Sequence, residues 1–366
     1  MSTLIVNVCV VDDVRPHPNA DRVELIHVKG WTCVSAIGQF QKGEKCVYFP
    51  PDSVIPEEVA EHFGIAKYCS PLAKGSDGVR PPGLRIRAQR FRGEPSFGTV
   101  QKLDDPSWPV GMSLLDHYRV TKYEPPMRTM DGDAAKPNSL FHAYTDIENV
   151  RNFPDLLEEG EEVVIMEKIH GSNLRLGLIF TAEDSPDGSA VHQFMAGSHG
   201  VRRKEFDQAG KRSKFWLGLT DPVKELLKDV AGDDKNVIIY GEIYGEGIQD
   251  LTYGVKGLAC RFFDISVNGK YLSWTEQAEV FARHPEVETA PILYRGPFSM
   301  EKVKELTDGN TTLCDPDKAG SFKGREGVVV RPTTERYSEK LPNYGRVILK
   351  SISVDYLGRK GGTEYH

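Results

Sequence analysis

The chain has 366 residues, of which 39% are hydrophobic and 27% charged, with a mean hydropathy of −0.41. This length favours two domains, and the composition is typical of a soluble globular protein. No apolar run approaches the roughly 18 residues of a membrane span, and the first residues lack the basic region of a signal peptide. The six cysteines include no CxxC pair, which indicates reduced thiols rather than disulfides or a zinc site. We therefore expect a soluble protein, cytoplasmic or otherwise intracellular, with no membrane association.

The net charge of −7 disfavours binding of a polyanion by the molecule as a whole. Residues 1–130 hold 16 Lys/Arg against 15 Asp/Glu, whereas the remainder holds 30 against 38. Within the first part, residues 80–92 carry five arginines and no acid. Any nucleic acid would therefore be met by a local basic patch, although an ordinary solvated loop also explains this run.

Short β-like runs separated by turn residues occupy the first third of the chain. They lie at 4–11, 22–28, 32–37, 45–49 and 84–91. Several short strands punctuated by Gly and Pro are typical of a small all-β barrel. We predict such a domain over residues 1–121.

Residues 122–140 are rich in proline, glycine and small polar residues and predict a linker. Beyond it, strand-like runs alternate with helix-like ones, which predicts an α+β domain with an antiparallel or mixed sheet over residues 141–366. The predicted strands are 161–168, 236–245, 258–265, 326–332 and 345–352, and the predicted helices are 223–231, 274–284 and 300–309.

Lys168 follows the apolar run VVIM and precedes the turn-forming residues HGSN. A lysine at the end of a buried strand is well placed to face a pocket. Its amine has an ordinary pKa near 10.4, so making it a nucleophile at pH 7 costs roughly 4–5 kcal/mol unless burial or a nearby cation lowers that pKa.

Glu242, Asp264 and Glu326 each lie in or beside an apolar strand, where an unpaired carboxylate is expensive. Lys350, on another such strand, adds a second positive charge suited to a phosphate. Any one of these residues is explained by a salt bridge at a sheet edge. These four residues together with Lys168 favour a catalytic site that holds a cation and a phosphate.

The order of these residues resembles the covalent nucleotidyltransferases, which comprise RNA ligases, DNA ligases and mRNA capping enzymes. EKIHGSN at 167–173 is similar to the first motif of the RNA ligase 2-like branch, and the resemblance covers about 150–357. SHGVRR (198–203), YGEIYG (240–245), RFFDI (261–265), REGVVVRP (325–332) and VILKS (347–351) follow in the family's order.

The resemblance implies an ATP-grasp-like nucleotidyltransferase domain in which Lys168 carries AMP, Glu242 contacts the ribose, Phe263 stacks on adenine and Lys350 binds the ATP phosphates. Its implied catalytic residues are Lys168, Glu242, Glu326 and Lys350. The implied nucleotide-binding residues are Glu167, Ile169, His170, Gly171, Asn173, Arg202, Arg203, Phe263 and Arg331. Mg²⁺ or Mn²⁺ is expected near Glu242, Glu326 and Asp264.

The sequence departs from the family in the phosphate-binding motifs. The fifth motif usually reads Lys-x-Lys, but Ile348 holds its first position, and Arg331 stands where the fourth often ends in lysine. Arginine binds phosphate through a rigid fork and does not replace lysine equally. In the second motif, the arginine is either Arg202 or Arg203.

HPNADRVELIHV at 17–28 resembles a segment of tRNA-binding OB modules, and an OB module placed before the transferase resembles the Naegleria-type RNA ligase. OB folds bind single strands through a basic groove and aromatic stacking. The RNA-binding candidates are His17, Arg22, Arg85, Arg87, Arg90 and Phe91. A simple turn before a strand also explains HPNAD.

The resemblance thus implies an ATP-dependent RNA ligase that joins a 3′-hydroxyl to a 5′-phosphate end of RNA. The alternatives are a DNA or hybrid-duplex ligase of the same superfamily, and an inactive relative that only binds RNA. A capping enzyme would prefer GTP to ATP. No feature of the sequence indicates an obligate protein partner.

Overall fold

The computed structural model describes residues 3–75, 78–124, 132–182, 188–315, 317–320 and 322–359. The chain divides into two compact units, one of residues 1–129 with 357–366 and the other of residues 130–356. The division falls inside the predicted linker, while the predicted boundaries at 121 and 141 stay a prediction. Of that linker, residues 125–131 lie outside the described residues.

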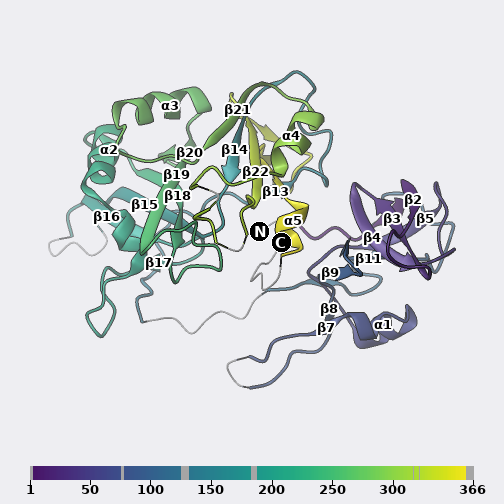
Figure 1. The fold of residues 1–366 in the computed structure, drawn as a ribbon. Coiled ribbons are helices and arrows are strands. Elements are labelled where there is room, and N and C mark those ends of the chain that lie inside the picture. Colours follow the sequence, from purple (N-terminus) through teal and green to yellow (C-terminus); the bar gives the residue numbers. More distant parts are fainter. Residues whose placement is uncertain are drawn as a thin grey trace. The chain divides into compact units, whose positions relative to one another are not determined.

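The first unit consists mainly of short strands (Figure 1). Its elements are β1 (Val8–Val10), β2 (Asp13–Pro16), β3 (Val23–Val28), β4 (Trp31–Ala36), β5 (Lys45–Phe49), β6 (Ser53–Ile55), α1 (Glu57–His62), η1 (Ala66–Tyr68), β7 (Ser70–Pro71), β8 (Leu84–Arg85), β9 (Ala88–Phe91), β10 (Glu94–Phe97), β11 (Thr99–Gln101) and β12 (Thr121–Lys122). All five predicted runs contain strands, which confirms the all-β character of this part.

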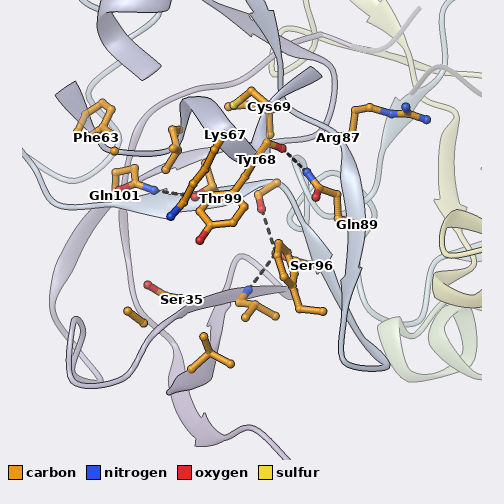
Figure 2. Close-up of a pocket in the computed structure, with 18 of the residues that line it drawn as sticks. Ser35, Phe63, Lys67, Tyr68, Cys69, Arg87, Gln89, Ser96, Thr99 and Gln101 are labelled. Atoms are coloured by element: carbon orange, nitrogen blue, oxygen red, sulfur yellow. Dashed lines mark hydrogen bonds between the residues drawn. The ribbon is translucent and has the colours of Figure 1, made fainter. Parts of the chain in front are cut away.

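The strands of the first unit pair in the orders β1-β5-β11, β2-β3-β4, β10-β9 and β12-β6-β8-β7, so they form four small antiparallel sheets rather than one continuous ladder. Their apolar side chains meet in a core that includes Val8, Val47, Phe49 and Leu114. A pocket of about 340 Å³ opens between the β3–β4 hairpin, the segment around η1 and strands β9–β11 (Figure 2).

The second unit contains two larger sheets. Its strands are β13 (Glu148–Asn149), β14 (Glu162–Lys168), β15 (Ser172–Thr181), β16 (Val191–Gly197), β17 (Arg202–Arg203), β18 (Val237–Gly245), β19 (Leu258–Val267), β20 (Lys270–Tyr271), β21 (Ile292–Pro297), β22 (Gly327–Pro332), β23 (Tyr337–Ser338), β24 (Gly345–Arg346) and β25 (Leu349–Ile352). Its helices are η2 (Lys214–Gly218), α2 (Asp221–Ala231), α3 (Trp274–Arg283), α4 (Met300–Thr307) and α5 (Val354–Leu357).

A six-stranded sheet has the order β17-β16-β15-β18-β19-β20 and a five-stranded sheet the order β13-β25-β22-β14-β21. Pairing is antiparallel except between β13 and β25, so the predicted mixed α+β arrangement is confirmed. The five predicted strands and three predicted helices are all present. The long strands β15 and β16 were not predicted from the sequence.

Alternation of side chains along the strands sorts the second unit into layers. One face of the six-stranded sheet packs on α2 through Leu174, Leu176 and Ile239. One face of the five-stranded sheet packs on α4 through Val163 and Ile165. The other faces supply smaller apolar clusters, which include Tyr240 and Ile348, or Val164 and Met166. Residues of both sheets share these clusters, so the inner faces meet each other.

Candidate active site

Lys168 ends strand β14 on the inner face of the five-stranded sheet. Alternation places it on the same face as Val164 and Met166, and it pairs in register with Gly327 at the start of β22. That pairing brings Glu326, the residue before Gly327, next to the lysine. The Nζ of Lys168 forms an ion pair with Oε1 of Glu326. The lysine side chain is 26% exposed and the glutamate 3%, so a buried carboxylate faces an accessible amine.

Glu242 joins this pair from strand β18 of the other sheet. Burial raises the pKa of Glu242 to about 8, while Lys168 lowers this pKa and Glu326 raises it. Both groups therefore lie within electrostatic range of Glu242. The two acids and the lysine therefore form one cluster, drawn from strands that are distant in sequence. Two carboxylates beside one ammonium, that of Glu326 buried and that of Glu242 half-buried, are electrostatically suited to an additional cation.

Gly171 allows the strands to approach closely beneath this cluster. A side-chain carbon at this position would collide with the backbone oxygen of Ile243 and would lie 2.9 Å from Cγ of Glu242. Next to it, Asn173 pairs in register with Glu242. Within the described chain, the buried Oδ1 of Asn173 accepts no hydrogen bond. A buried acceptor in this state is suited to a donor group on a ligand.

His170 is buried and held on three sides. Its backbone N–H donates to the hydroxyl of Tyr253 at 2.8 Å, its Nε2 lies 2.8 Å from Oδ1 of Asp250, and its Nδ1 lies 2.6 Å from the hydroxyl of Tyr356. The sequence analysis singled out none of these three partners, because they lie 80 to 186 residues away from the histidine. The imidazole fixes the turn between β14 and β15.

Glu167 does not face the nucleotide side as predicted. It precedes Lys168 and therefore points to the opposite face of β14. There it accepts hydrogen bonds from Thr311 and Thr312, including 2.8 Å from the backbone N–H of Thr312. Its role is to anchor this loop behind the strand. Ile169, also predicted to bind nucleotide, is a buried apolar residue.

Lys350 lies on the same inner face as Lys168. It pairs with Val329, which in turn pairs with Met166, so the three side chains form a row across the sheet. Ile348, two residues earlier on this face, is 1% exposed within an apolar cluster that includes Phe141, Ile179 and Tyr240. The position that carries lysine in the usual motif is therefore part of the core in this chain.

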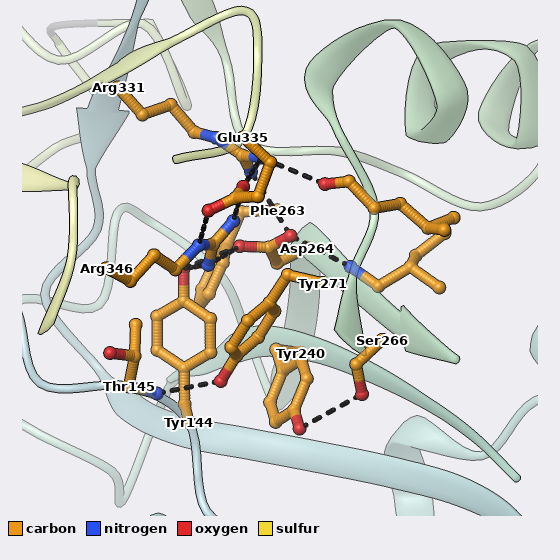
Figure 3. A network of polar contacts seen from close by, with 12 residues as sticks. Tyr144, Thr145, Tyr240, Phe263, Asp264, Ser266, Tyr271, Arg331, Glu335 and Arg346 are labelled. Carbon is orange, nitrogen blue, oxygen red and sulfur yellow. Dashed lines mark hydrogen bonds and ion pairs between the residues drawn. The ribbon is translucent and has the colours of Figure 1, made fainter. Parts of the chain in front are cut away.

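Asp264 was predicted to bind metal, but the structure places it in a separate buried network (Figure 3). Its Oδ1 lies 3.1 Å from Arg331 and its Oδ2 is 2.5 Å from Arg346, with a hydrogen bond of 2.8 Å from Tyr144. Burial alone raises the pKa of Asp264, but the two arginines and Tyr144 hold it below its ordinary value. Both oxygens serve this network, so Asp264 is not a member of the Lys168 cluster. In the part of the chain that the structure describes, no group of three or more His, Cys, Asp or Glu side chains is arranged to hold a metal.

Arg331 was predicted to contact phosphate and is instead 1% exposed. It pairs in register with Val164, four residues before Lys168 and roughly 13 Å along the strand. Besides Asp264, it donates to Glu335 at 2.8 Å and to the carbonyl of Leu272 at 3.0 Å. These contacts indicate that the Arg331 guanidinium stabilises the fold rather than binding phosphate.

Phe263 lies where β19 bulges. Tyr240 pairs with Asp264 and Gly241 with Phe262, so Phe263 has no register partner on β18. Its ring lies 5.1 Å from that of Tyr144 and packs against the cluster of Val164 and Met166. The bulge thus turns Phe263 toward the inner face, beside the Asp264 network.

The paired arginines of SHGVRR differ in their surroundings. Arg203 donates to Asp133 at 2.5 Å and lies 5.4 Å from the ring of Phe215. Arg202 donates to the carbonyl of Lys136 at 3.3 Å and is half-buried. Of the two, Arg202 has the weaker described contact. A third arginine that the sequence analysis missed, Arg175, is buried and donates to the carbonyls of Ser198 and Phe141.

Comparison with known proteins identifies the family to which this chain belongs. A family model described as RNA ligase matches residues 161–352, which include every residue of the Lys168 cluster. The chain belongs to the RNA ligase family. A second model, an OB-fold domain, matches residues 5–103 and confirms the predicted OB-type architecture of the first unit. A search of curated proteins found no match.

Solved structures with the same fold include several of an RNA ligase from Naegleria gruberi. A mutant with AMP and Mn has a TM-score of 0.72 at 24% identity over 97% of this chain and 98% of that one. A mutant with ATP and Mn gives 0.71 at 24% identity, over 96% and 98%. The ligase with PPi gives 0.69 at 23% identity, over 97% and 98%. The fold of the Naegleria gruberi ligase is therefore shared along nearly the whole length of both chains.

The predicted RNA-binding residues of the OB unit separate into two groups. His17 is buried, accepts from the N–H of Asn19 at 3.0 Å and lies 2.9 Å from the carbonyl of Phe91, so it holds the HPNAD turn rather than a ligand. Arg85 is paired with Asp52 and stacks 3.9 Å from the ring of Tyr123. Both residues are structural, and the turn interpretation of HPNAD is the better one.

The other four candidates remain at or near the surface. Arg90 donates to the carbonyls of Gly93 and Gly358, while Arg22 and Arg87 are exposed. Phe91 is half-buried and lines the pocket of about 340 Å³, as does Arg87.

No helix among the described residues is long and apolar enough to cross a bilayer.

Proposed function

We propose that this RNA ligase uses ATP to join a 3′-hydroxyl to a 5′-phosphate through AMP carried on Lys168. The observation that carries the proposal is the cluster of Lys168, Glu326 and Glu242, which come from both sheets. The cluster lies beside a turn in which position 171 has room only for glycine. The Naegleria gruberi structures with ATP and Mn, with AMP and Mn and with PPi support the same cosubstrate and metal for this chain.

In the first step, the amine of Lys168 attacks the α-phosphorus of ATP. A nitrogen–phosphorus bond forms, the bond to the β-phosphate oxygen breaks, and pyrophosphate leaves. The lysine must first give up its proton and separate from Glu326, since an ion-paired ammonium has no lone pair for attack. Its 26% exposure leaves room for the phosphate to approach.

The remaining residues position the nucleotide. Glu242 and Asn173 lie side by side across β18 and β15, so we assign them to the ribose and neighbouring polar groups. Phe263 supplies an aromatic face for adenine. Lys350 shares the inner face with Lys168 and is suited to the phosphates. Positioning and charge stabilisation are the main tasks of a protein in phosphoryl transfer.

The two glutamates fit a divalent cation. Mg²⁺ commonly takes one or two protein carboxylates together with waters and substrate phosphates, so Glu242 and Glu326 suffice without Asp264. Such a cation, Mg²⁺ or Mn²⁺, would offset the repulsion between the glutamates and neutralise charge on the phosphates. Glu242 and Glu326 would provide its binding groups and its counter-charge.

In the later steps, the 5′-phosphate oxygen of an RNA end displaces Lys168 from AMP. A 3′-hydroxyl then attacks that activated phosphate and releases AMP, which seals the strand. Arg22, Arg87, Arg90 and Phe91 of the OB unit are our candidates for RNA contact. We place the reaction inside the cell, where the six free cysteines stay reduced.

Labelling with ATP tests the proposal. We expect wild-type protein with MnCl₂ or MgCl₂ to acquire AMP covalently, and Lys168→Ala to acquire none while remaining folded. Lys228→Ala is the matched control, because Lys228 pairs with Glu225 at 2.9 Å on the exposed face of α2. A folded wild-type protein that takes up no label would overturn the proposal.

Two further comparisons define the reaction. Labelling with each of the four nucleoside triphosphates should favour ATP, and a preference for GTP would indicate a capping reaction. Sealing assays on nicked RNA, nicked DNA and hybrid duplexes should favour RNA with 3′-hydroxyl and 5′-phosphate ends. Equal sealing of nicked DNA would replace the proposed substrate with a broader one.

A further inference from the structure

We propose that the pocket of the OB unit binds one unstacked nucleobase of single-stranded RNA, with Tyr68 as the stacking surface and Lys67 and Arg87 as contacts for the flanking phosphates. The inference deepens the proposed ligase function, on which it rests, by assigning an unpaired nucleotide of the substrate to this pocket.

The size and position of the pocket suit a single base. Its volume of about 340 Å³ lies at the small end of the roughly 300–1,000 Å³ typical of ligand pockets. Its walls come from three separate parts of the OB unit, which include Ser35 on β4, Tyr68 on η1 and Gln101 on β11 (Figure 2). The side-chain amide of Gln89 donates to the carbonyl of Tyr68 at 2.5 Å and ties the η1 segment to β9.

Charge distinguishes the pocket from the rest of the chain. Among its lining residues are Lys67 and Arg87, but no Asp or Glu, although the protein carries a net charge of −7. Lys67 lies over one face of the Tyr68 ring, with Nζ 4.9 Å from the ring centre, so a base must displace this lysine or stack on the opposite face. In Figure 2 the guanidinium of Arg87 points away from the pocket. Two cations at the rim match a ligand whose charge lies outside the pocket, as it does in the phosphates on either side of a base.

Aromatic surface is available in the same place. The side chain of Tyr68 is 47% exposed, and its ring meets that of Phe91 edge-on at 6.0 Å and 76°. An exposed ring held by a neighbouring ring is a platform on which any base can stack, whatever its identity.

Neutral polar groups complete the pocket. Ser35 donates to Oε1 of Gln39 at 2.7 Å, and Gln101 donates to Thr99 at 2.7 Å. The first bond occupies the amide oxygen of Gln39, and the second uses one N–H of the Gln101 amide. The amide nitrogen of Gln39 and the amide oxygen of Gln101 are therefore suited to the donor and acceptor groups on a base edge.

RNA binding by single-residue variants of the full chain tests the pocket. Fluorescence anisotropy would use a labelled 12-nucleotide single-stranded RNA and a 12-base-pair RNA duplex. We expect Tyr68→Ala to bind the single strand on the order of five- to a hundredfold more weakly and Tyr68→Phe to bind it normally, because stacking needs only the ring. Duplex binding should be unchanged. Lys67→Ala should weaken single-strand binding and reduce its salt dependence, whereas Lys42→Ala, which removes an exposed lysine outside the pocket, should do neither.

Abasic substitutions then identify the base. In a set of RNAs with one abasic nucleotide each, we expect one position to weaken wild-type binding by the same factor as Tyr68→Ala, with no further loss when both changes are combined. Additive losses, or a Tyr68→Ala variant that binds the single strand like wild type, would overturn the pocket. Free AMP that competes as strongly as RNA would also overturn it, because the site would then be one for mononucleotides.

The same variants separate this inference from the proposed function. Covalent labelling by AMP depends on Lys168, so Tyr68→Ala should label at the wild-type rate. Normal labelling with unchanged RNA binding would reject the pocket and leave the ligase chemistry intact. Absence of labelling in wild type, together with the expected loss of RNA binding in Tyr68→Ala, would reject the chemistry and support the pocket.

Discussion

Lys168 is ion-paired with Glu326, a residue 158 positions further along the chain, because β14 and β22 are neighbouring antiparallel strands. An ion pair of this kind favours the ammonium form of the proposed nucleophile, and both partners influence the pKa of Glu242. The site is therefore organised for a cation before any nucleotide arrives. The following predictions rest on this organisation and on the buried network behind it.

Glu242→Gln should change how stability depends on pH. The folded-state pKa of about 8 lies above the ordinary 4.5, so the folded protein binds more protons than the unfolded chain between these values. The wild-type free energy of unfolding should therefore fall as pH rises from about 4.5 to 8. Above pH 8 this contribution should fall no further. In thermal melts with a chelator present, the melting temperature of Glu242→Gln should rise relative to that of the wild type between pH 5 and pH 9. Glu246→Gln, an exposed control, should track wild type. Parallel curves for Glu242→Gln would contradict the prediction.

Asp264→Asn should be strongly destabilising. It leaves Arg331 and Arg346, both 1% exposed, without the charge between them, which typically costs about 3–5 kcal/mol. Asp229 provides the control, since it also pairs with an arginine, Arg283, and lies 3.1 Å from Nε2 of His284, but is 43% exposed. Asp229→Asn should cost less than about 1 kcal/mol. Urea denaturation measures both, and equal losses would show that the Asp264 network is not strongly coupled.

Ile348→Lys, which restores the usual residue of the fifth motif, should lower the free energy of unfolding. The side chain is 1% exposed in an apolar cluster, so a lysine there buries an unpaired charge. We expect several kcal/mol of lost stability and no gain in AMP labelling, measured by denaturation and by labelling of the folded fraction. Ile348→Met, which conserves volume, should cost less than about 1.5 kcal/mol. A stable and more active Ile348→Lys would show that the missing lysine limits this ligase.

Gly171→Ala should nearly abolish AMP labelling. The added carbon collides with the carbonyl of Ile243 and crowds Glu242, so the turn after Lys168 must shift. A displacement of about 1 Å at a reacting group can reduce the rate on the order of a hundredfold. Gly200→Ala is the matched control, because nothing lies within 4 Å of its added carbon. Labelling rates at saturating ATP compare the two, and equal rates would contradict the tight fit at Gly171.

Local patterns in the sequence were sufficient for much of this protein. Strand and helix periods located the five predicted strands and three predicted helices of the second unit, and the ordered motifs around Lys168, Glu242, Glu326 and Lys350 indicated the family. Strands β15 and β16 were missed because HGSN indicated a turn, although the alternating residues Leu174, Leu176 and Leu178 contained the signal of a strand.

Only the tertiary structure decided which charged residues share a site. Asp264 and Glu242 lie on neighbouring strands, but a bulge puts Asp264 opposite Tyr240, where Arg331 and Arg346 neutralise it. His17 likewise proved structural, because its Nε2 lies 2.9 Å from the carbonyl of Phe91, which is 74 positions away. Short patterns record which face of a strand a side chain occupies, because alternation is local. Partners across sheets depend on register and bulges, which long-range packing sets.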